Sequence, residues 1–232
     1  MQIIPVIDLF AGNVVHAHAG QRESYKNIVT SLCNGSKPIE IVEAINSLYQ
    51  FSTIYIADLN AIKDEGNNNQ IINSLLERYP QICFWLDAGN HTYPYPTSQS
   101  QLRQITASET NISKNQLHSN KNRANTILSL DFFSDGYKGD QEILENPDSW
   151  PDDIIVMSLN RIGLNKGPDF LQFEKIKCLC PNKRFYIAGG VRNENDLDRS
   201  KKMGAAGILL ASALHDGRIT KELLLKYSST SV

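Results

Sequence analysis

Two aspartates close apolar stretches of this 232-residue chain: Asp8 follows residues 3–7, and Asp131 follows residues 126–130. Apolar stretches of this length predict buried strands, so both carboxylates are expected at strand ends. Carboxylates that are partly buried near each other perturb each other's pKa values, and they can divide the general-acid and general-base roles. Two aspartates that cap loops or pair with lysines would give the same spacing, so both interpretations stay open at this point.

A glycine pair, Gly189-Gly190, follows another apolar stretch at residues 184–188 and precedes a predicted helix. Glycines at such a place let backbone N–H groups approach an anion, and the helix N-terminus adds a favourable dipole. After the last apolar stretch, Ala211 and Ser212 are expected to form the second wall of the same anion site. A tight turn would need the same glycines, so the pair alone does not decide between the two interpretations.

Eight short apolar stretches recur along the chain, with amphipathic segments between several of them. The predicted strands are residues 3–7, 53–59, 82–86, 104–107, 126–130, 154–159, 184–188 and 207–210. The predicted helices are residues 38–49, 69–78, 169–179, 193–203 and 219–227, with Asn193 as an N-cap. This alternation favours one (β/α)8 TIM barrel over residues 1–232. Pro94 and Pro96 predict that the helix between the third and fourth strands is missing or shortened.

The two halves of the chain resemble each other in three segments that occur in the same order. The matching pairs are residues 5–9 with 128–132, 56–62 with 156–162, and 86–89 with 187–190. A shared order of this kind is expected of duplicated half-barrels. The first and fifth strands of an eight-stranded barrel face each other, and barrel active sites lie at the C-terminal strand ends. The symmetry therefore favours a functional role for Asp8 and Asp131.

The composition is that of an ordinary globular protein, with 41% hydrophobic residues, 21% charged residues and a net charge of −2. It gives no electrostatic reason to expect nucleic acid or a membrane surface as a partner, and no stretch is apolar enough to span a bilayer. Four scattered cysteines and an N-terminus without a basic leader favour a reducing cytoplasm. We expect no cofactor and no metal, and a monomer or small homo-oligomer; His16 and His18, for example, lack a third ligand.

Further motifs make the chain resemble the HisA family, the histidine-biosynthesis isomerases that open the sugar of a phosphoribosyl-formimino aminoimidazole carboxamide nucleotide. The motifs are, in chain order, Ile4-Pro5-Val6-Ile7-Asp8-Leu9, Leu128-Ser129-Leu130-Asp131, Gly163 with Gly167-Pro168, Ala188-Gly189-Gly190-Val191 and Gly204-Ala205-Ala206-Gly207-Ile208. They extend over nearly the whole chain and are specific for the HisA/HisF superfamily. The resemblance implies a TIM barrel in which Asp8 and Asp131 are catalytic and Gly167, Gly189 and Gly190 hold phosphate.

The chain departs from the isomerase pattern at positions that matter for the reaction. Ile162 stands where the isomerases carry the aspartate of an Arg-Asp-Gly motif, and Met157 stands where they carry a threonine. Ala211-Ser212 replaces the Gly-Arg that usually follows the eighth strand. An isoleucine side chain cannot transfer a proton, and general acid catalysis is typically worth ~10²–10⁴-fold. The pattern therefore resembles a divergent HisA-like paralogue.

A second set of departures concerns the loop that holds the family's first phosphate, where this chain has Asp87 and His91. Asp87 would repel a phosphate, and Glu109 after the fourth strand adds another negative charge. We expect a ligand with one phosphate, whose other end carries polar or cationic groups. His91 is a candidate acid or base, although an exposed loop histidine is the simpler interpretation. Arg161, in the loop after the sixth strand, is a candidate contact for an anion.

Three functions follow from these observations. The leading hypothesis is an isomerase or lyase that acts on a small phosphorylated, sugar-like metabolite by acid–base chemistry through Asp8 and Asp131. The resemblance also implies a link to one-carbon (methanopterin-type) cofactor biosynthesis. The second hypothesis is the histidine-pathway isomerase itself, which Ile162 disfavours. The third is a non-catalytic barrel that binds a metabolite or a partner protein.

Overall fold

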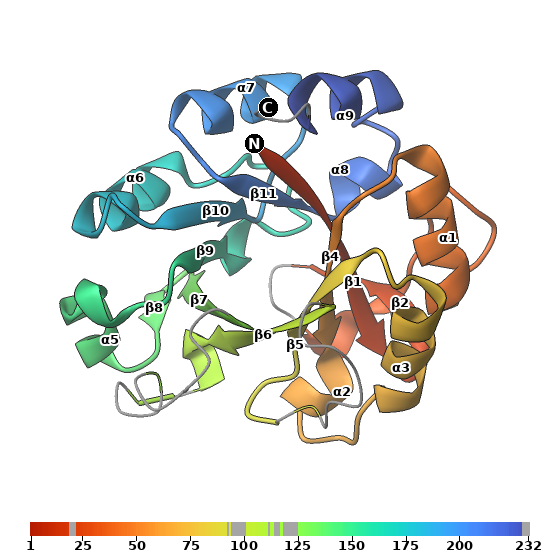
Figure 1. Ribbon diagram of the computed structural model, residues 1–232, viewed down its shortest axis with the longest axis horizontal. Helices are drawn as coiled ribbons and strands as arrows, with labels where there is room; N and C mark the ends of the chain where they lie inside the picture. The colour runs from red at the N-terminus through yellow and green to blue at the C-terminus, as the bar shows by residue number, and fades with distance from the viewer. Residues whose placement is uncertain are drawn as a thin grey trace.

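Eight parallel strands close into a barrel in a computed structural model, which describes residues 1–18, 22–91, 93, 101–110, 112–113, 117 and 125–228. Around the barrel each strand pairs with the next, and the last pairs with the first. In this order the strands are β1 (Gln2–Phe10), β4 (Thr53–Asp58), β5 (Cys83–Asp87), β6 (Leu102–Ala107), β7 (Thr126–Phe133), β9 (Asp153–Ser158), β10 (Arg184–Ala188) and β11 (Gly207–Leu210). The predicted TIM barrel is confirmed, and Figure 1 shows its helices arranged around the strands.

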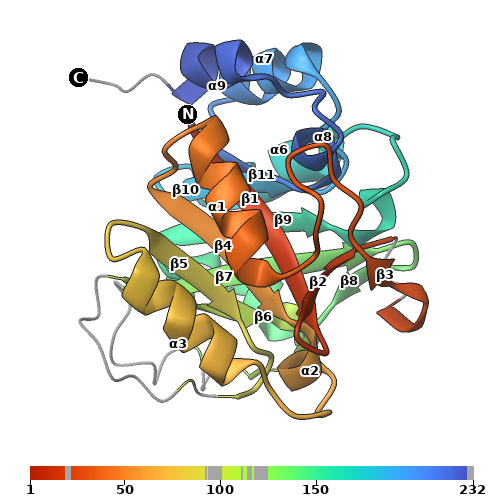
Figure 2. The same cartoon turned by 90° about the vertical axis from the view of Figure 1, so that its right-hand side faces the viewer.

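The helices connect successive strands on the outside of the barrel, as α1 and α3 do in Figure 2. They are α1 (Pro38–Leu48), α2 (Leu59–Ile62), α3 (Asn69–Arg78), α5 (Gln141–Glu145), α6 (Phe170–Leu179), α7 (Glu194–Lys202), α8 (Ser212–His215) and α9 (Lys221–Ser228). Short 3-10 turns add η1 (Arg22–Ser24), η2 (Ser108–Thr110), η4 (Pro147–Ser149) and η5 (Leu159–Arg161). Asn193 caps α7 as predicted, since its side chain accepts a hydrogen bond from the Asp196 backbone N–H. None of the described helices is long and apolar enough to cross a membrane.

Most barrel strands are buried on both faces, which explains the near-continuous apolar stretches in the sequence. On β1, Ile3 and Ile7 face the helices and belong to the large outer core. Ile4 points the other way and joins the inner core of the barrel, together with residues such as Trp85 and Tyr186 from other strands. The same alternation of side chains carries Val6 and Asp8 to the inside, above Ile4.

The N-terminal end of the barrel is closed by a buried ionic cluster around Asp153, at the start of β9. Its carboxylate accepts hydrogen bonds from Arg103 Nη2 at 2.6 Å, Arg184 Nε at 2.6 Å and Tyr186 Oη at 2.9 Å. Burial alone would raise the pKa of Asp153, but the two arginines hold it below its ordinary value. The charge of Asp153 is therefore compensated within the fold.

Two hairpins at the opposite, C-terminal end of the barrel correct the predicted strand boundaries. β1 continues past Asp8 to Phe10 and pairs antiparallel with β2 (Asn13–His16), which pairs in turn with β3 (Lys26–Asn27). β7 likewise continues past Asp131 to Phe133 and pairs with β8 (Gly136–Lys138). Asp8 and Asp131 therefore lie within hairpin strands instead of ending them. The cause is the antiparallel extension, which adds backbone hydrogen bonds beyond the parallel barrel.

The predicted loss or shortening of the third helix concerns residues 88–101, between β5 and β6. Residues 92 and 94–100 lie outside the part of the chain that the structure describes, so this expectation stays a prediction.

Candidate active site

An open cavity of about 450 Å³ lies at the C-terminal ends of the barrel strands, where barrel active sites are found. It receives side chains or backbone from all the barrel strands or the loops that follow them. The residues that line it are Val6, Asp8, His16, Ala17, Tyr25, Tyr55, Ala57, Leu59, Ile62, Asp87, Glu109, Asp131, Met157, Leu159, Ile162, Gly163, Asn165, Ala188, Gly189, Gly190, Val191, Arg192, Leu209, Ala211, Ser212, Asp216 and Arg218. The mouth of this barrel is therefore hollow, as a small-molecule site requires.

Carboxylates gather on the side of the cavity formed by β1, β4 and β5. The strand register places Asp8 beside Ala57 and Ala57 beside Asp87, so the two aspartates lie at one level, two strands apart. Tyr55, one inward position below Ala57, donates its hydroxyl to Asp87 Oδ2 at 3.1 Å. Burial, and then the charges of Asp87, Asp131 and Asp8, raise the pKa of Tyr55 well above its ordinary value. Tyr55 is thus a neutral hydrogen-bond donor among three carboxyl groups.

Asp131 faces this group from β7 and is only 3% exposed. Its oxygens accept hydrogen bonds from Ser129 Oγ at 2.6 Å and from the Glu109 backbone N–H at 3.0 Å. Burial raises the pKa of Asp131 to about 7, with further contributions from the charges of Glu109 and Asp87, and these outweigh the two hydrogen bonds. The sequence led us to expect that Asp8 and Asp131 perturb each other, whereas burial is the dominant cause here. A carboxyl group with this pKa can both donate and accept a proton near neutral pH.

The hydrogen bonds of Ser108 fit a protonated Asp131. Ser108 Oγ accepts from the Asp131 backbone N–H at 2.9 Å, and it lies 2.7 Å from the Lys138 carbonyl oxygen and 3.2 Å from Asp131 Oδ2. A hydroxyl group has one proton, and the shorter contact assigns it to the Lys138 carbonyl. The contact with Oδ2 is then satisfied when Asp131 itself is the donor, which is the neutral form that burial favours.

The opposite side of the cavity is formed by the loops after β9, β10 and β11. Gly189 and Gly190 have φ values of +96° and +85°, which side chains other than glycine rarely adopt. A Cβ atom on Gly189 would lie 2.4 Å from the Ser158 carbonyl oxygen, and one on Gly190 would lie 2.5 Å from the Gly167 carbonyl oxygen. The glycine pair is therefore required both by its backbone conformation and by the close approach of the neighbouring loop.

Two arginines lie at this glycine side, in contrast to the carboxylates opposite. Arg192 donates to the Asp196 carboxylate from Nε at 2.8 Å and from Nη2 at 2.9 Å. Arg218 donates to Asn165 Oδ1 at 3.0 Å and to Asp216 Oδ2 at 2.8 Å. Arg218 thereby connects the loop after β9 with the segment after α8. The cavity has a carboxylate end and an end with arginine and exposed glycine backbone.

Seven of the ten residues that the sequence predicted to be catalytic or ligand-binding line this cavity: Asp8, Asp87, Asp131, Gly189, Gly190, Ala211 and Ser212. Three others do not. The Gly167 carbonyl packs against Gly190, and the Arg161 guanidinium lies 3.7 Å from Asp169. His91 Nε2 lies 2.8 Å from Asp64 Oδ1, on a separate cavity of about 240 Å³.

Sequence reasoning missed Tyr55 and Arg218. Tyr55 and Ala57 are alternate residues of β4, so both side chains point into the barrel. A tyrosine at an inward-facing position of a largely apolar strand was the feature of the sequence that could have identified it. Arg218 gave no such signal, because the path of its loop alone brings it to the cavity. His16, considered above only as a metal ligand, also lines the cavity. In the described part of the chain, no group of three or more His, Cys, Asp and Glu side chains could hold a metal ion.

The fold and this mouth define a (β/α)8 barrel with a metabolite-sized cavity, and comparison with known proteins gives its family. The family model of the histidine biosynthesis proteins matches residues 2–132 and 146–220. The chain therefore belongs to this family, which contains the HisA and HisF barrels. The resemblance drawn from the sequence motifs is confirmed.

Individual relatives match over nearly the full chain. An uncharacterized protein of Methanocaldococcus jannaschii is 30% identical over 232 residues, which cover 97% of this chain and 98% of the relative. An imidazole-4-carboxamide isomerase of Flavobacterium johnsoniae is 22% identical over 248 residues, covering 98% and 99%. One of Thermococcus onnurineus is 23% identical over 239 residues, covering 97% and 98%.

Proposed function

We propose that this protein is a HisA-like enzyme that binds a small metabolite through one phosphate and transforms it by acid–base chemistry, as an isomerase or lyase. The phosphate would lie at the glycine end of the cavity, and the reacting part at the carboxylate end. Asp131 would transfer a proton, with Asp8 as the second carboxylate. One observation carries the proposal: Asp131 is a carboxyl group with a pKa of about 7 on the wall of an open cavity.

The phosphate end is supported mainly by its backbone. Ser212 begins α8, a short extra helix after the last barrel strand, and such helices commonly bind phosphate in these barrels. The first hydrogen bond of α8 runs from the Leu214 N–H to the Ala211 carbonyl, so the N–H groups of Ser212 and Ala213 precede it. Arg218, which is paired with Asp216, lies on the same wall.

The carboxylate end supports a ligand with a single phosphate. Asp87 and Glu109 line the cavity there, and a second phosphate would face their negative charges. A polar or cationic group on the ligand would instead be attracted to them and could accept the hydrogen bond of Tyr55 or donate to Asp87. The link to one-carbon (methanopterin-type) cofactor biosynthesis, which the resemblance implies, stays a prediction.

The two other hypotheses are less well supported by specific observations. The histidine-pathway isomerase needs an acid where Ile162 projects into the cavity, and Met157 offers no proton beside it. A non-catalytic barrel that binds a metabolite or a partner protein would also have a use for the cavity of about 450 Å³, but it has no need for a buried carboxyl group with a pKa of about 7 on the cavity wall.

A substitution at Ser212 tests the phosphate end without disturbing the glycines. We expect Ser212→Asp to lower the affinity for inorganic phosphate about tenfold or more, because a second negative charge would lie within a few ångströms of the bound anion. The fold should tolerate the change, since an acidic residue is favourable in the first turn of a helix. Isothermal titration calorimetry with inorganic phosphate measures the effect.

Ser212→Asn is the matched control, because asparagine has the shape of aspartate without its charge. Its affinity for phosphate should stay within about threefold of the wild type, which separates charge from steric exclusion. Equal phosphate affinity of wild type and Ser212→Asp, or no measurable binding to the wild type, would place the anion elsewhere and overturn the assignment of this end.

A further inference from the structure

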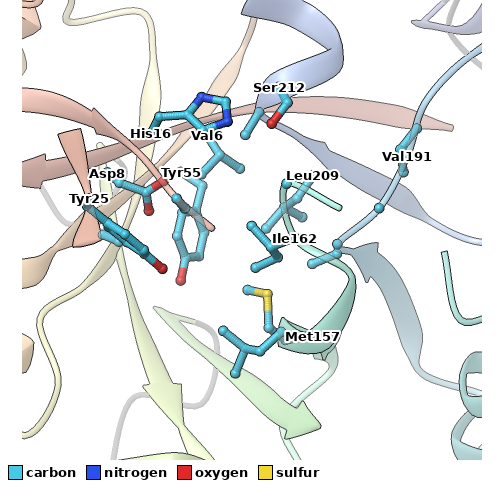
Figure 3. Close-up of a pocket in the computed structure, with 18 of the residues that line it drawn as sticks. Val6, Asp8, His16, Tyr25, Tyr55, Met157, Ile162, Val191, Leu209 and Ser212 are labelled. Carbon is cyan, nitrogen blue, oxygen red and sulfur yellow. The ribbon is translucent and has the colours of Figure 1, made fainter. Parts of the chain in front are cut away.

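The middle of the cavity, between its carboxylate end and its glycine end, is apolar. The register of β9, β10 and β11 places Met157 beside Ala188 and Ala188 beside Leu209, so three apolar side chains form one level of the wall. Ile162, from the loop after β9, lines the same cavity. In the view of Figure 3, Met157, Ile162 and Leu209 lie between Tyr55 and Val191.

This apolar level has one carboxyl group beside it and two across the barrel. Asp131 is beside Met157 in the register, whereas Asp8 and Asp87 lie across the barrel on β1 and β5. Val6, below Asp8 on β1, is also apolar and lines the cavity. A ligand that extends from Ser212 to Tyr55 therefore runs along Met157, Ile162 and Leu209, whose side chains can neither donate nor accept hydrogen bonds, and His16 is the polar side chain near Val6.

These apolar side chains favour some ligands over others, according to the middle part of the ligand that contacts them. A polyhydroxylated sugar would lose water from several hydroxyl groups against Met157, Ile162 and Leu209 without regaining hydrogen bonds, which is unfavourable. An apolar or aromatic body would gain from the same contacts, and the flexible thioether of Met157 packs well against rings. In the isomerases that the chain resembles, polar residues stand at the positions of Met157 and Ile162, so the apolar level distinguishes this chain.

We propose that the natural ligand has an apolar or aromatic body, rather than a polyhydroxylated sugar, between its phosphate and its hydrogen-bonding head. This inference rests on the proposed function, because it assumes that phosphate occupies the glycine end. It replaces the sugar-like metabolite expected from the sequence with a phosphorylated, ring-containing or unsaturated compound. Met157, Ile162 and Leu209 are then specificity-determining residues of the site.

Four phosphate monoesters test the inference in one calorimetric series. Two have an aromatic body: 4-(aminomethyl)benzyl phosphate and 4-methylbenzyl phosphate. Two have a sugar body: glucosamine 6-phosphate and glucose 6-phosphate. We expect each aromatic compound to bind about tenfold or more tightly than the sugar phosphate with the matching head. The amino group should tighten binding in both pairs, which tests the carboxylate end separately.

Substitutions at Met157 test whether the apolar level causes the preference for aromatic over sugar phosphates. Met157→Gln keeps the length and unbranched shape of the side chain but adds a hydrogen-bond donor and acceptor, so the aromatic-to-sugar ratio should fall about fivefold or more. Met157→Leu keeps the site apolar and should leave the ratio within about twofold. A structural defect would weaken both ligand classes alike and would leave the ratio unchanged.

The outcomes separate this inference from the proposed function. If the sugar phosphates bind as tightly as the aromatic ones, and Ser212→Asp weakens all four, the phosphate site stands and the apolar-body inference is overturned. An unchanged ratio in Met157→Gln overturns it as well. If none of the four compounds and no inorganic phosphate binds, both this inference and the proposed function are wrong.

Discussion

Replacing Asp131 with asparagine is expected to stabilise the folded protein at alkaline pH, even though it removes the proposed catalytic acid. Asp131 is buried, and its pKa is raised from 3.8 to about 7. One pKa unit corresponds to about 1.4 kcal/mol, so ionising this group in the fold costs on the order of 4 kcal/mol. Asparagine does not ionise and avoids that cost. Stability and activity should therefore change in opposite directions at this position.

The raised pKa of Asp131 determines the direction in which the stability of the wild type changes with pH. Below about pH 4 the carboxyl group is protonated in both the folded and the unfolded chain, and its contribution to stability is fully present. As the pH rises towards 7 the unfolded chain ionises while the folded chain holds its proton, so stability falls across this window. The advantage of Asp131→Asn over the wild type should thus grow from pH 4 to pH 8. Urea unfolding of both proteins at pH 5 and pH 8 measures it.

Asparagine keeps two of the three hydrogen bonds of the site. Ser129 Oγ can accept from the asparagine Nδ2 instead of donating, and the Glu109 N–H can still donate to Oδ1 after the amide is turned. The contact with Ser108 Oγ loses its donor, at a cost that is the same at both pH values. Asp135→Asn is the control, because that exposed carboxylate in the next loop has its pKa lowered by Lys138 and should give no such gain. A stability difference between Asp131→Asn and the wild type that is the same at both pH values would refute the raised pKa.

Gly190→Ala should destabilise the protein by roughly 2–5 kcal/mol. The backbone there has a φ of +85°, and an L-residue in that region costs roughly 1–2 kcal/mol. The new methyl group would also lie 2.5 Å from the Gly167 carbonyl oxygen, and such overpacking costs about 1–3 kcal/mol. The free energy of unfolding from urea titrations measures the sum.

Gly66→Ala separates the two contributions. Gly66 has a φ of +98°, and a Cβ atom there would meet nothing within 4 Å, so only the backbone cost applies. We expect Gly66→Ala to lose roughly 1–2 kcal/mol and Gly190→Ala to lose clearly more. Equal losses at both positions would mean that the loops after β9 and β10 do not approach each other as closely as described.

The apolar periodicity of the sequence was sufficient for the fold but not for all of its boundaries. Strands buried on both faces appear as short continuous apolar stretches, and residues 184–188 and 207–210 matched β10 and β11 to the residue. The ends of β1 and β7 were wrong, because the hairpins with β2 and β8 extend both strands beyond their aspartates. The apolar residues of these extensions, such as Leu9 and Phe132, follow the aspartates, and an apolar stretch interrupted by a charged residue does not show that the strand continues.

Site residues that directly follow a strand could be predicted from the sequence. Site residues whose position depends on long-range packing of the loops could not. Asp8, Asp131 and Gly189 were found because strand order alone brings strand ends to one mouth. The positions of Arg161 and Arg218 depend on loop paths and on ion pairs with Asp169 and Asp216, which no local pattern encodes.

Capture of the natural ligand tests the central claim most directly. Immobilised Asp131→Asn protein, which keeps the glycine end intact, would be incubated with a metabolite extract, and the retained compounds identified by mass spectrometry. We predict enrichment of a compound with one phosphate that the wild-type enzyme converts and the variant does not. Retention only of compounds without phosphate, or of a phosphorylated compound that the wild type leaves unchanged, would contradict the account.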